Sequence, residues 1–365
     1  MLKFNKTAKA LAAVAAISAL ALTGCGRSEP SGGGATTAAG FAKDATIGVA
    51  LPQKTSENWV LAEGLFNDGL TSAGFKPSVQ FANGGVSEQQ NQISSMITNG
   101  AKVIIVGAID GAQLGTQLQQ AKDAGAVIIA YDRLLLNTAN VDYYVAYDNY
   151  KVGQLQGQAL LDGMKAKKAA GPYNVELFAG SPDDANAKVF FDGAMNVLQP
   201  KIDDGTLVVV SGQKTFEQAV TQGWKAENAQ KRMDTLLAGN YTSTELDGVL
   251  SPNDTLARAV ITSVKAAGKP IPTVTGQDSE VESVKSIMAG EQYSTINKDT
   301  TALVKHSIQM VQDLQAGKTP EINDPTSYNN GTKVVPAFLL VPQIVTKANA
   351  AQQYANDKIL GPLTK

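Results

Sequence analysis

Short apolar runs alternate with longer amphipathic segments along most of the chain, and this alternation is typical of an α/β protein built on parallel sheets. The apolar runs are rich in Val and Ile and have the length of strands that are buried on both faces. We expect strands at 46–51, 78–81, 103–106, 127–130, 142–146, 174–178, 207–210, 248–250, 274–275 and 293–296. Between them we expect helices at 58–73, 88–99, 112–124 and 152–164.

The strand–helix series starts again after residue 142. Two successive α/β units of similar size predict two lobes, each a doubly wound parallel sheet, with a cleft between them. The likeness between the units lies only in the order of their elements, since no sequence repeat relates them. The length of the folded body, from about residue 44 onwards, also suggests two domains at roughly 150 residues per domain.

Residues 1–24 have the features of a signal peptide and are not expected to form part of the fold. Three lysines precede an apolar stretch, 10–22, which is too short for a spanning helix of about 20 residues. The single cysteine, Cys25, ends the run Leu22-Thr23-Gly24-Cys25, which resembles the lipobox of bacterial lipoproteins. We therefore expect acylation of Cys25, attachment to the cell membrane and a flexible linker over 25–43. The alternative is an ordinary secretory signal that happens to contain a cysteine.

The charge and the residue types present exclude several function classes. The formal net charge is −2, and removal of the signal peptide makes the mature chain more acidic. No basic stripe remains for a phosphate backbone, which argues against a nucleic-acid partner. His306 is the only histidine, so a zinc site would need carboxylates alone. We expect no metal and no cofactor.

Polar side chains gather where three of the expected strands end. The clusters are Tyr131-Asp132-Arg133, Ser251-Pro252-Asn253-Asp254 and Gly276-Gln277-Asp278. In open α/β sheets, ligands bind outside the carboxyl ends of the strands, so these clusters are expected to face one crevice. Carboxylates and amide oxygens accept from hydroxyl groups, while Arg and amide nitrogens donate to them. The pattern therefore favours a neutral, hydroxyl-rich ligand.

These clusters belong to a longer ordered series of motifs. The further members are Tyr147-Asp148-Asn149, Gly180-Ser181-Pro182-Asp183-Asp184-Ala185-Asn186-Ala187, the run 284–292, Lys298-Asp299-Thr300 and the run 330–336. Over about residues 46–345 the series resembles the type-I periplasmic sugar-binding proteins, most closely their multiple-sugar and xylose-binding group. The resemblance implies lobes joined by a three-segment hinge, with crossings near Asp148, Asp278 and Asn297. The implied lobes are 44–147 plus 279–296, and 148–278 plus 297–365.

The resemblance also implies a set of ligand-binding residues. They are Glu57, Asn58, Trp59, Asp132, Arg133, Asn149, Asn186, Trp224, Asn253, Asp254, Asp278 and Lys298. Asn58 departs from the family pattern, because the nearest relatives carry Arg there, and the loss of that cation should weaken binding of acidic sugars. Most of these residues also have a structural interpretation: an ion pair at a turn for Asp132 and Arg133, and helix capping for Asn253, Asp254 and Asp278. Asn149 and Asn186 could be turn residues, Lys298 a solvated lysine, and the two tryptophans could belong to the core.

The resemblance predicts an extracytoplasmic, lipid-anchored, monomeric receptor without enzymatic activity. It would bind an aldopyranose such as xylose, glucose, galactose or arabinose and deliver it to an ABC transporter permease. A sensory role with a chemoreceptor or sensor kinase is one alternative, and a nucleoside or non-sugar polyol as ligand is another. A glycosidase is the enzymatic alternative, since two carboxyl groups about 5–9.5 Å apart would suffice for it.

Overall fold

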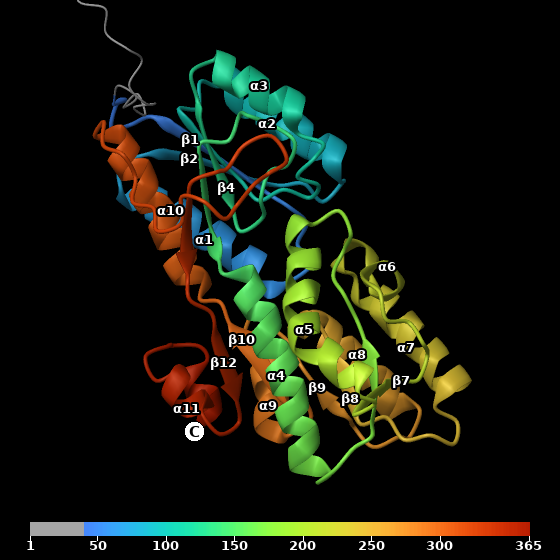
Figure 1. The fold of residues 1–365 in the computed structure, drawn as a ribbon. Coiled ribbons are helices and arrows are strands. Elements are labelled where there is room, and N and C mark those ends of the chain that lie inside the picture. The colour runs from blue at the N-terminus through green and yellow to red at the C-terminus, as the bar shows by residue number, and fades with distance from the viewer. Residues whose placement is uncertain (1–39) are drawn as a thin grey trace, which may run out of the picture. The chain divides into compact units, whose positions relative to one another are not determined.

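The computed structural model describes residues 40–365. The expected signal peptide, Cys25 and the expected linker up to residue 39 lie outside the described residues. Among residues 40–365, no helix combines the length and the apolar character that crossing a bilayer requires. The described chain forms the two sheets with flanking helices that the sequence predicts (Figure 1).

A six-stranded parallel sheet is the core of the N-terminal lobe. Its strands, in spatial order, are β11 (Ala337–Leu340), β5 (Tyr143–Tyr147), β4 (Val127–Tyr131), β3 (Val103–Val106), β1 (Thr46–Leu51) and β2 (Lys76–Phe81). Alternate side chains of a strand point to opposite faces, so Val49 and Ala50 lie in different core clusters. Helices α1 (Glu57–Ser72) and α10 (Thr300–Gln315) cover one face, and α2 (Val86–Thr98) and α3 (Gly115–Asp123) cover the other.

A smaller parallel sheet is the core of the C-terminal lobe. Its order is β7 (Leu207–Val209), β6 (Tyr173–Leu177), β8 (Gly248–Leu250) and β9 (Thr273–Val274). Helices α4 (Asn149–Lys167) and α5 (Ala185–Asp203) cover one face, and α7 (Ala226–Asn240) and α8 (Asp254–Ala266) the other. The remaining elements are α6 (Phe216–Ala219), a 3₁₀ turn (Gln222–Trp224), α9 (Val281–Ala289), the antiparallel pair β10 (Ser294–Asn297) and β12 (Gln343–Thr346), α11 (Ala350–Gln353) and a 3₁₀ turn (Gly361–Thr364).

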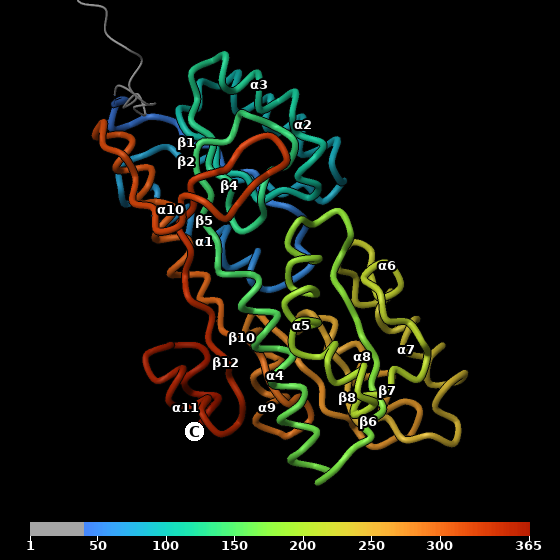
Figure 2. The backbone as a smooth tube through the Cα atoms, in the orientation of Figure 1, coloured from blue at the N-terminus to red at the C-terminus, as the bar shows by residue number. Residues whose placement is uncertain are grey.

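The chain crosses between the lobes three times (Figure 2). The first crossing, at Asp148, joins β5 to α4, and the second, at Lys298, joins β10 to α10. The third lies at Val341, between β11, which pairs with β5, and β12, which pairs with β10. A three-segment connection is therefore present, with two crossings close to the expected positions.

The expected division of the C-terminal third of the chain is wrong. Residues 279–296 were expected in the N-terminal lobe, yet α9 and β10 pack with the C-terminal lobe, and no crossing occurs near Asp278. Conversely, α10 and β11 were expected in the C-terminal lobe, yet both complete the N-terminal lobe; in Figure 1 the orange α10 lies beside the blue α1. The apolar face of α10 predicts burial, but its periodicity does not reveal which sheet it covers.

The helix expected at 152–164 begins three residues earlier, at Asn149. Asp148 supplies the reason, because its carboxylate accepts a hydrogen bond from the backbone N–H of Lys151 at 3.0 Å. Aspartate is a favoured N-cap residue, so the start of this helix was readable from the sequence. The cap fixes the direction in which the chain leaves the N-terminal lobe at the first crossing.

Helices α4 and α5 pack so closely that only glycine fits at their contact. A Cβ atom on Gly153 would collide with the backbone carbonyl oxygen of Phe190, and one on Gly193 with that of Tyr150. We expect Gly153→Ala to lower the free energy of unfolding by about 1–3 kcal/mol, the usual cost of overpacking, as measured by urea denaturation.

The matched control is Gly64→Ala on α1, where the added Cβ meets no atom within 4 Å. Alanine is the better helix former, so this variant should be more stable by about 0.5–1 kcal/mol. Equal effects of the two substitutions would contradict the close α4–α5 contact.

Candidate functional site

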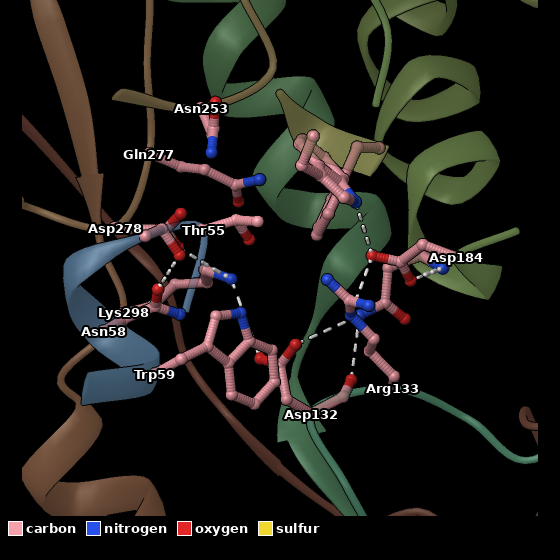
Figure 3. A pocket seen from close by; sticks show the side chains of 14 residues that line it. Thr55, Asn58, Trp59, Asp132, Arg133, Asp184, Asn253, Gln277, Asp278 and Lys298 are labelled. Carbon is pink, nitrogen blue, oxygen red and sulfur yellow. Dashed lines mark hydrogen bonds and ion pairs between the residues drawn. The ribbon is translucent and has the colours of Figure 1, made fainter. Parts of the chain in front are cut away.

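A cavity lies where the carboxyl ends of strands from both lobes face each other (Figure 3). The N-terminal lobe contributes the loop after β1 and the residues that follow β4, and the C-terminal lobe contributes the loops after β6, β8 and β9. The lining residues are Thr55, Ser56, Asn58, Trp59, Asp132, Arg133, Asp184, Asn186, Phe190, Trp224, Asn253, Gln277, Asp278 and Lys298. The strand-end rule therefore brings the three polar clusters of the sequence to one place.

Lys298 is the charged centre of this cavity. Its Nζ lies 3.0 Å from Asp278 Oδ1 in the C-terminal lobe and 3.8 Å from Asp132 Oδ2 in the N-terminal lobe. Burial alone would lower the pKa of Lys298, but the two carboxylates outweigh burial and raise its pKa to about 12. The ammonium group is thus charged at neutral pH and attracts both lobes.

A second ion pair joins the lobes across the cavity. Arg133 Nε lies 3.0 Å from Asp184 Oδ2, although the pair lacks the geometry of a hydrogen bond. Asp184 also accepts from Trp224 Nε1 at 3.0 Å, while Arg133 donates to the carbonyl of Ala108 at 2.9 Å. Burial raises the pKa of Asp184, and the guanidinium charge of Arg133 partly offsets that rise.

Aromatic rings from both lobes border the charged groups. Trp59 is buried, with the Arg133 guanidinium 5.2 Å from its ring centroid, a distance at which a cation–π attraction acts. Trp224 is also buried, and its ring lies against Gly180, where any Cβ would collide with it. The cavity therefore offers apolar ring surfaces next to fixed hydrogen-bonding groups.

Backbone strain is concentrated at this cavity. Five residues other than glycine have positive φ in the described part of the chain, and three of them line the cavity: Asp132 (60°), Trp224 (55°) and Asp278 (94°). Such conformations cost on the order of 1–3 kcal/mol each and cluster at functional sites. The strain turns these three side chains into the space between the lobes.

Nine of the twelve predicted residues line the cavity: Asn58, Trp59, Asp132, Arg133, Asn186, Trp224, Asn253, Asp278 and Lys298. Thr55, Ser56, Asp184, Phe190 and Gln277 also line it but are not among the twelve. Asp184 and Gln277 stand inside motifs that the resemblance already rested on. Thr55, Ser56 and Phe190 carry no signal of their own in the sequence beyond lying next to predicted residues or on the same helix.

Asp254 and Asn149 lie behind the cavity rather than in it. The buried Asp254 accepts from the backbone N–H of Glu280 (3.0 Å), Gln292 Nε2 (2.7 Å) and Thr295 Oγ1 (2.9 Å), so it holds α9 and β10 in place. Burial, followed by the charge of Glu280, raises its pKa well above the usual value.

Asn149 donates to the Tyr144 hydroxyl at 3.2 Å. That hydroxyl lies 2.7 Å from the Asp132 carbonyl oxygen, to which it donates. Asn149 therefore supports the strained Asp132 from behind.

Glu57 also lies outside the cavity lining. Its side chain is directed at the C-terminal lobe, where Oε2 accepts from the backbone N–H of Val281 at 2.8 Å. Glu57, Asn149 and Asp254 therefore lie outside the cavity lining, where each side chain has a structural partner, and their contact with the ligand stays a prediction.

The charged cavity is narrow, ≈ 30 Å³, because the side chains of the two lobes reach across it and pair. A wider cavity of ≈ 640 Å³ lies beside it and shares Asp184 and Asn186 with it. The wider cavity is lined largely by apolar side chains such as Leu134, Leu136 and Phe216. The strand-end clusters and both tryptophans converge only on the narrow cavity among the cavities of the described residues, so it is the candidate site.

The chain is similar to several known proteins. A family model described as a periplasmic binding protein domain matches residues 47–319. The multiple sugar-binding periplasmic receptor ChvE of Rhizobium radiobacter is 48% identical over 315 residues, which cover 85% of this chain and 89% of that protein. The D-xylose-binding periplasmic protein of Escherichia coli (strain K12) is 35% identical over 323 residues, 88% of this chain and 93% of that protein.

Solved structures agree in fold. An ABC transporter solute-binding protein from Clostridium phytofermentans with bound β-D-glucose superposes with a TM-score of 0.84 at 39% identity, over 88% of this chain and all of that one. A carbohydrate transporter solute-binding protein from Chloroflexus aurantiacus in complex with D-glucose gives 0.80 at 32% identity, over 87% of this chain and 97% of that one.

The buried Arg133–Asp184 pair gives a stability prediction. Asp184→Ala leaves a buried guanidinium without its counter-charge, so we expect the ligand-free protein to lose about 3–5 kcal/mol of unfolding free energy, as measured by chemical denaturation. Arg133→Leu combined with Asp184→Leu removes both charges and should recover much of that loss.

The control is Asp183→Ala, which removes the neighbouring, half-buried carboxylate. Its effect should stay below about 1 kcal/mol. If Asp184→Ala were as mild as this control, the pair would not matter for stability.

Proposed function

The chain belongs to the periplasmic binding protein family, and from that premise we propose that it is an extracytoplasmic receptor which binds one monosaccharide between its lobes. The proposed ligand is an aldopyranose such as xylose, glucose, galactose or arabinose, delivered to an ABC transporter permease. The observation that carries the proposal is the convergence of paired charges and two tryptophans at the strand ends of both lobes.

The side chains around the cavity match the chemistry of a sugar. Each hydroxyl is both donor and acceptor, so it can bind a carboxylate and a cation together. Asp278 with Lys298, and Asp132 with Arg133, supply such combinations. The rings of Trp59 and Trp224 supply the apolar surface for the C–H face of a pyranose. On entry the sugar hydroxyls take up part of the bonding that now joins these side chains to one another.

Relatives with this architecture support an aldose as the ligand class. One is named a multiple sugar-binding receptor, another binds D-xylose, and two similar structures contain glucose. Glucose and xylose differ by one hydroxymethyl group. A site that binds both discriminates by hydroxyl contacts rather than by size, which is the kind of contact that the charged groups of this cavity provide.

Binding residues from two lobes provide a mechanism for signalling occupancy. A ligand shifts an open–closed equilibrium only through its better affinity for one state. A sugar that contacts Arg133 in one lobe and Asp278 in the other favours the closed state. Closure about the three crossings then presents a surface that a permease recognises. A chemoreceptor or sensor kinase could read the same state, and no contact among residues 40–365 favours such a partner over a permease.

We propose binding without turnover. The carboxylates that a glycosidase would need are engaged by cations: Asp278 with Lys298 and Asp184 with Arg133. Burial raises the pKa of both carboxyl groups, but each is held by a cation of the protein and is not free to reach a glycosidic oxygen or an attacking water. The arrangement therefore suits hydrogen bonding to hydroxyls better than cleavage of a glycosidic bond.

The test is calorimetric titration of residues 44–365 with neutral aldoses and with galacturonate, after removal of co-purified ligand. We expect saturable binding of one or more neutral aldoses and weaker binding of galacturonate, because Asn58 offers no cation. Asp278→Ala should weaken the tightest complex by about 10- to 150-fold, the value of a hydrogen bond to a charged group. Asp183→Ala is the control that should bind normally. A folded sample that binds none of these sugars would refute the proposal.

We also propose that Cys25 is acylated and anchors the receptor to the outer surface of the cell membrane. The support is the run Leu22-Thr23-Gly24-Cys25 after an apolar stretch. In cells fed a labelled fatty acid, the full chain should incorporate label and stay with the membrane fraction. Cys25→Ala should abolish the label and release the protein. Equal labelling of both forms would overturn the anchor.

A further inference from the structure

Two helices of opposite lobes begin at the same place, at the edge of the candidate site. Helix α1 of the N-terminal lobe starts at Glu57, and α9 of the C-terminal lobe starts at Val281. The first N–H groups of a helix have no partner within the helix. Neither N-cap residue, Ser56 nor Glu280, satisfies such a group of its own helix with its side chain.

Each helix instead donates its first backbone N–H to the carboxylate of a glutamate in the other lobe. Glu57 Oε2 accepts from the Val281 N–H at 2.8 Å, and Glu280 Oε1 accepts from the Glu57 N–H at 3.2 Å. A carboxylate at a helix N-terminus is stabilised by the helix dipole as well as by the hydrogen bond. The two bonds are reciprocal, and both join the lobes.

The C-terminal half of this arrangement is held in place within its own lobe. The Glu280 side chain is fully buried and pairs with Arg258 at 2.6 Å, and Thr255 donates to it at 2.9 Å. Both partners lie on α8, so Glu280 keeps its position whether the lobes are together or apart. Glu57, by contrast, is exposed and has its partner only in the other lobe.

We propose that Glu57, Glu280 and the N–H of Val281 form a glutamate clasp that stabilises the closed arrangement of the lobes without touching the sugar. The proposal rests on the proposed sugar-receptor function. None of the three residues lines the cavity, yet Ser56 and Asn58 flank Glu57, and Asp278 precedes Glu280 by two residues. Sugar contact and clasp formation therefore involve neighbouring residues at the starts of α1 and α9. Because the clasp itself stabilises the closed state, less of the sugar's binding energy is needed for closure.

One bond of the clasp, from the Val281 N–H to the Glu57 carboxylate, can be removed by changing either its acceptor or its donor. Glu57→Ala removes the acceptor, and Val281→Pro removes the donor. Proline is favoured at the first position of a helix, and Glu280, with φ −64° and ψ 142°, already has the conformation that a residue before proline prefers. Glu282→Ala is the matched control, because it removes an exposed acid of the same helical turn whose partner, Lys285, lies on its own helix.

The experiment measures closure and affinity in the same set of proteins. Interlobe distance is followed by a pair of fluorescent labels, one on each lobe, without and with saturating glucose or xylose, and affinity and dissociation rate are measured for the same sugar. We expect Glu57→Ala and Val281→Pro each to weaken binding about 3- to 10-fold, mainly through faster dissociation. We also expect both to shift the ligand-free protein towards the open state.

The double variant should be no weaker than either single variant, because each already abolishes the same bond. Glu282→Ala should behave as the unmodified protein. Binding and interlobe distance that are unchanged in both single variants, or losses that simply add, would overturn the clasp. If the unmodified protein binds no sugar, the receptor function fails, and the ligand-free distances alone decide on the clasp.

Discussion

The burial of one ammonium group organises the space between the lobes. Lys298 stands at the second crossing of the chain, where it is only 8% exposed. A buried charge is costly unless it is paired, and its partners, Asp278 and Asp132, come from different lobes. Both partners are held with positive φ, so the backbone strain at the strand ends and the charge between them are parts of one arrangement. The pairing of Lys298 with both carboxylates therefore links the strand ends of the two lobes, alongside the Arg133–Asp184 pair.

The same pairing of charges also bears on how the site can bind a ligand. Buried ion pairs contribute little net stability, because desolvation offsets most of the attraction between the charges. The charged groups of such a pair can therefore exchange one partner for another at small cost. A hydroxyl-rich ligand suits this exchange, because each hydroxyl can donate to a carboxylate or accept from a cation. The apolar rings of Trp59 and Trp224 do not change partners in this way, and they give the cavity its shape. Rigid rings and exchangeable charges thus have separate roles.

Much of the fold followed from the sequence because local patterns determine it. The strands at 103–106 and 248–250 are found at the expected residues, since continuous apolar runs bounded by turns leave little ambiguity. The placement of α10 and β11 did not follow, because an amphipathic helix or an apolar strand fits either sheet. Nothing in the residues of α10 records that its partner, α1, lies more than two hundred positions away. The topology of the C-terminal third is therefore a property of the assembled core.

The site residues were predictable to a similar extent. Strand ends located Asp132, Arg133 and Asp278, but adjacent residues of one type could not be separated. Asp183 and Asp184 look alike in the sequence, yet only the second is buried against Arg133.

Side-chain direction at a helix start was equally hard to predict. Asn253 faces the cavity while Asp254, one position on, turns inward to hold α9. Glu57 and Trp59 begin the same helix and point to different partners. Such choices depend on side-chain direction around a helix start, which no spacing rule specifies.

The late return of the chain to the N-terminal lobe has a consequence for folding during synthesis. The core of that lobe includes Leu303, Val311 and the strand β11, which ends at Leu340. A chain that emerges with its N-terminus first therefore exposes the apolar face of the first sheet until almost all of its length has appeared. The C-terminal lobe is also unfinished until β12 arrives after β11. The cores of both lobes are therefore completed only by the last part of the chain.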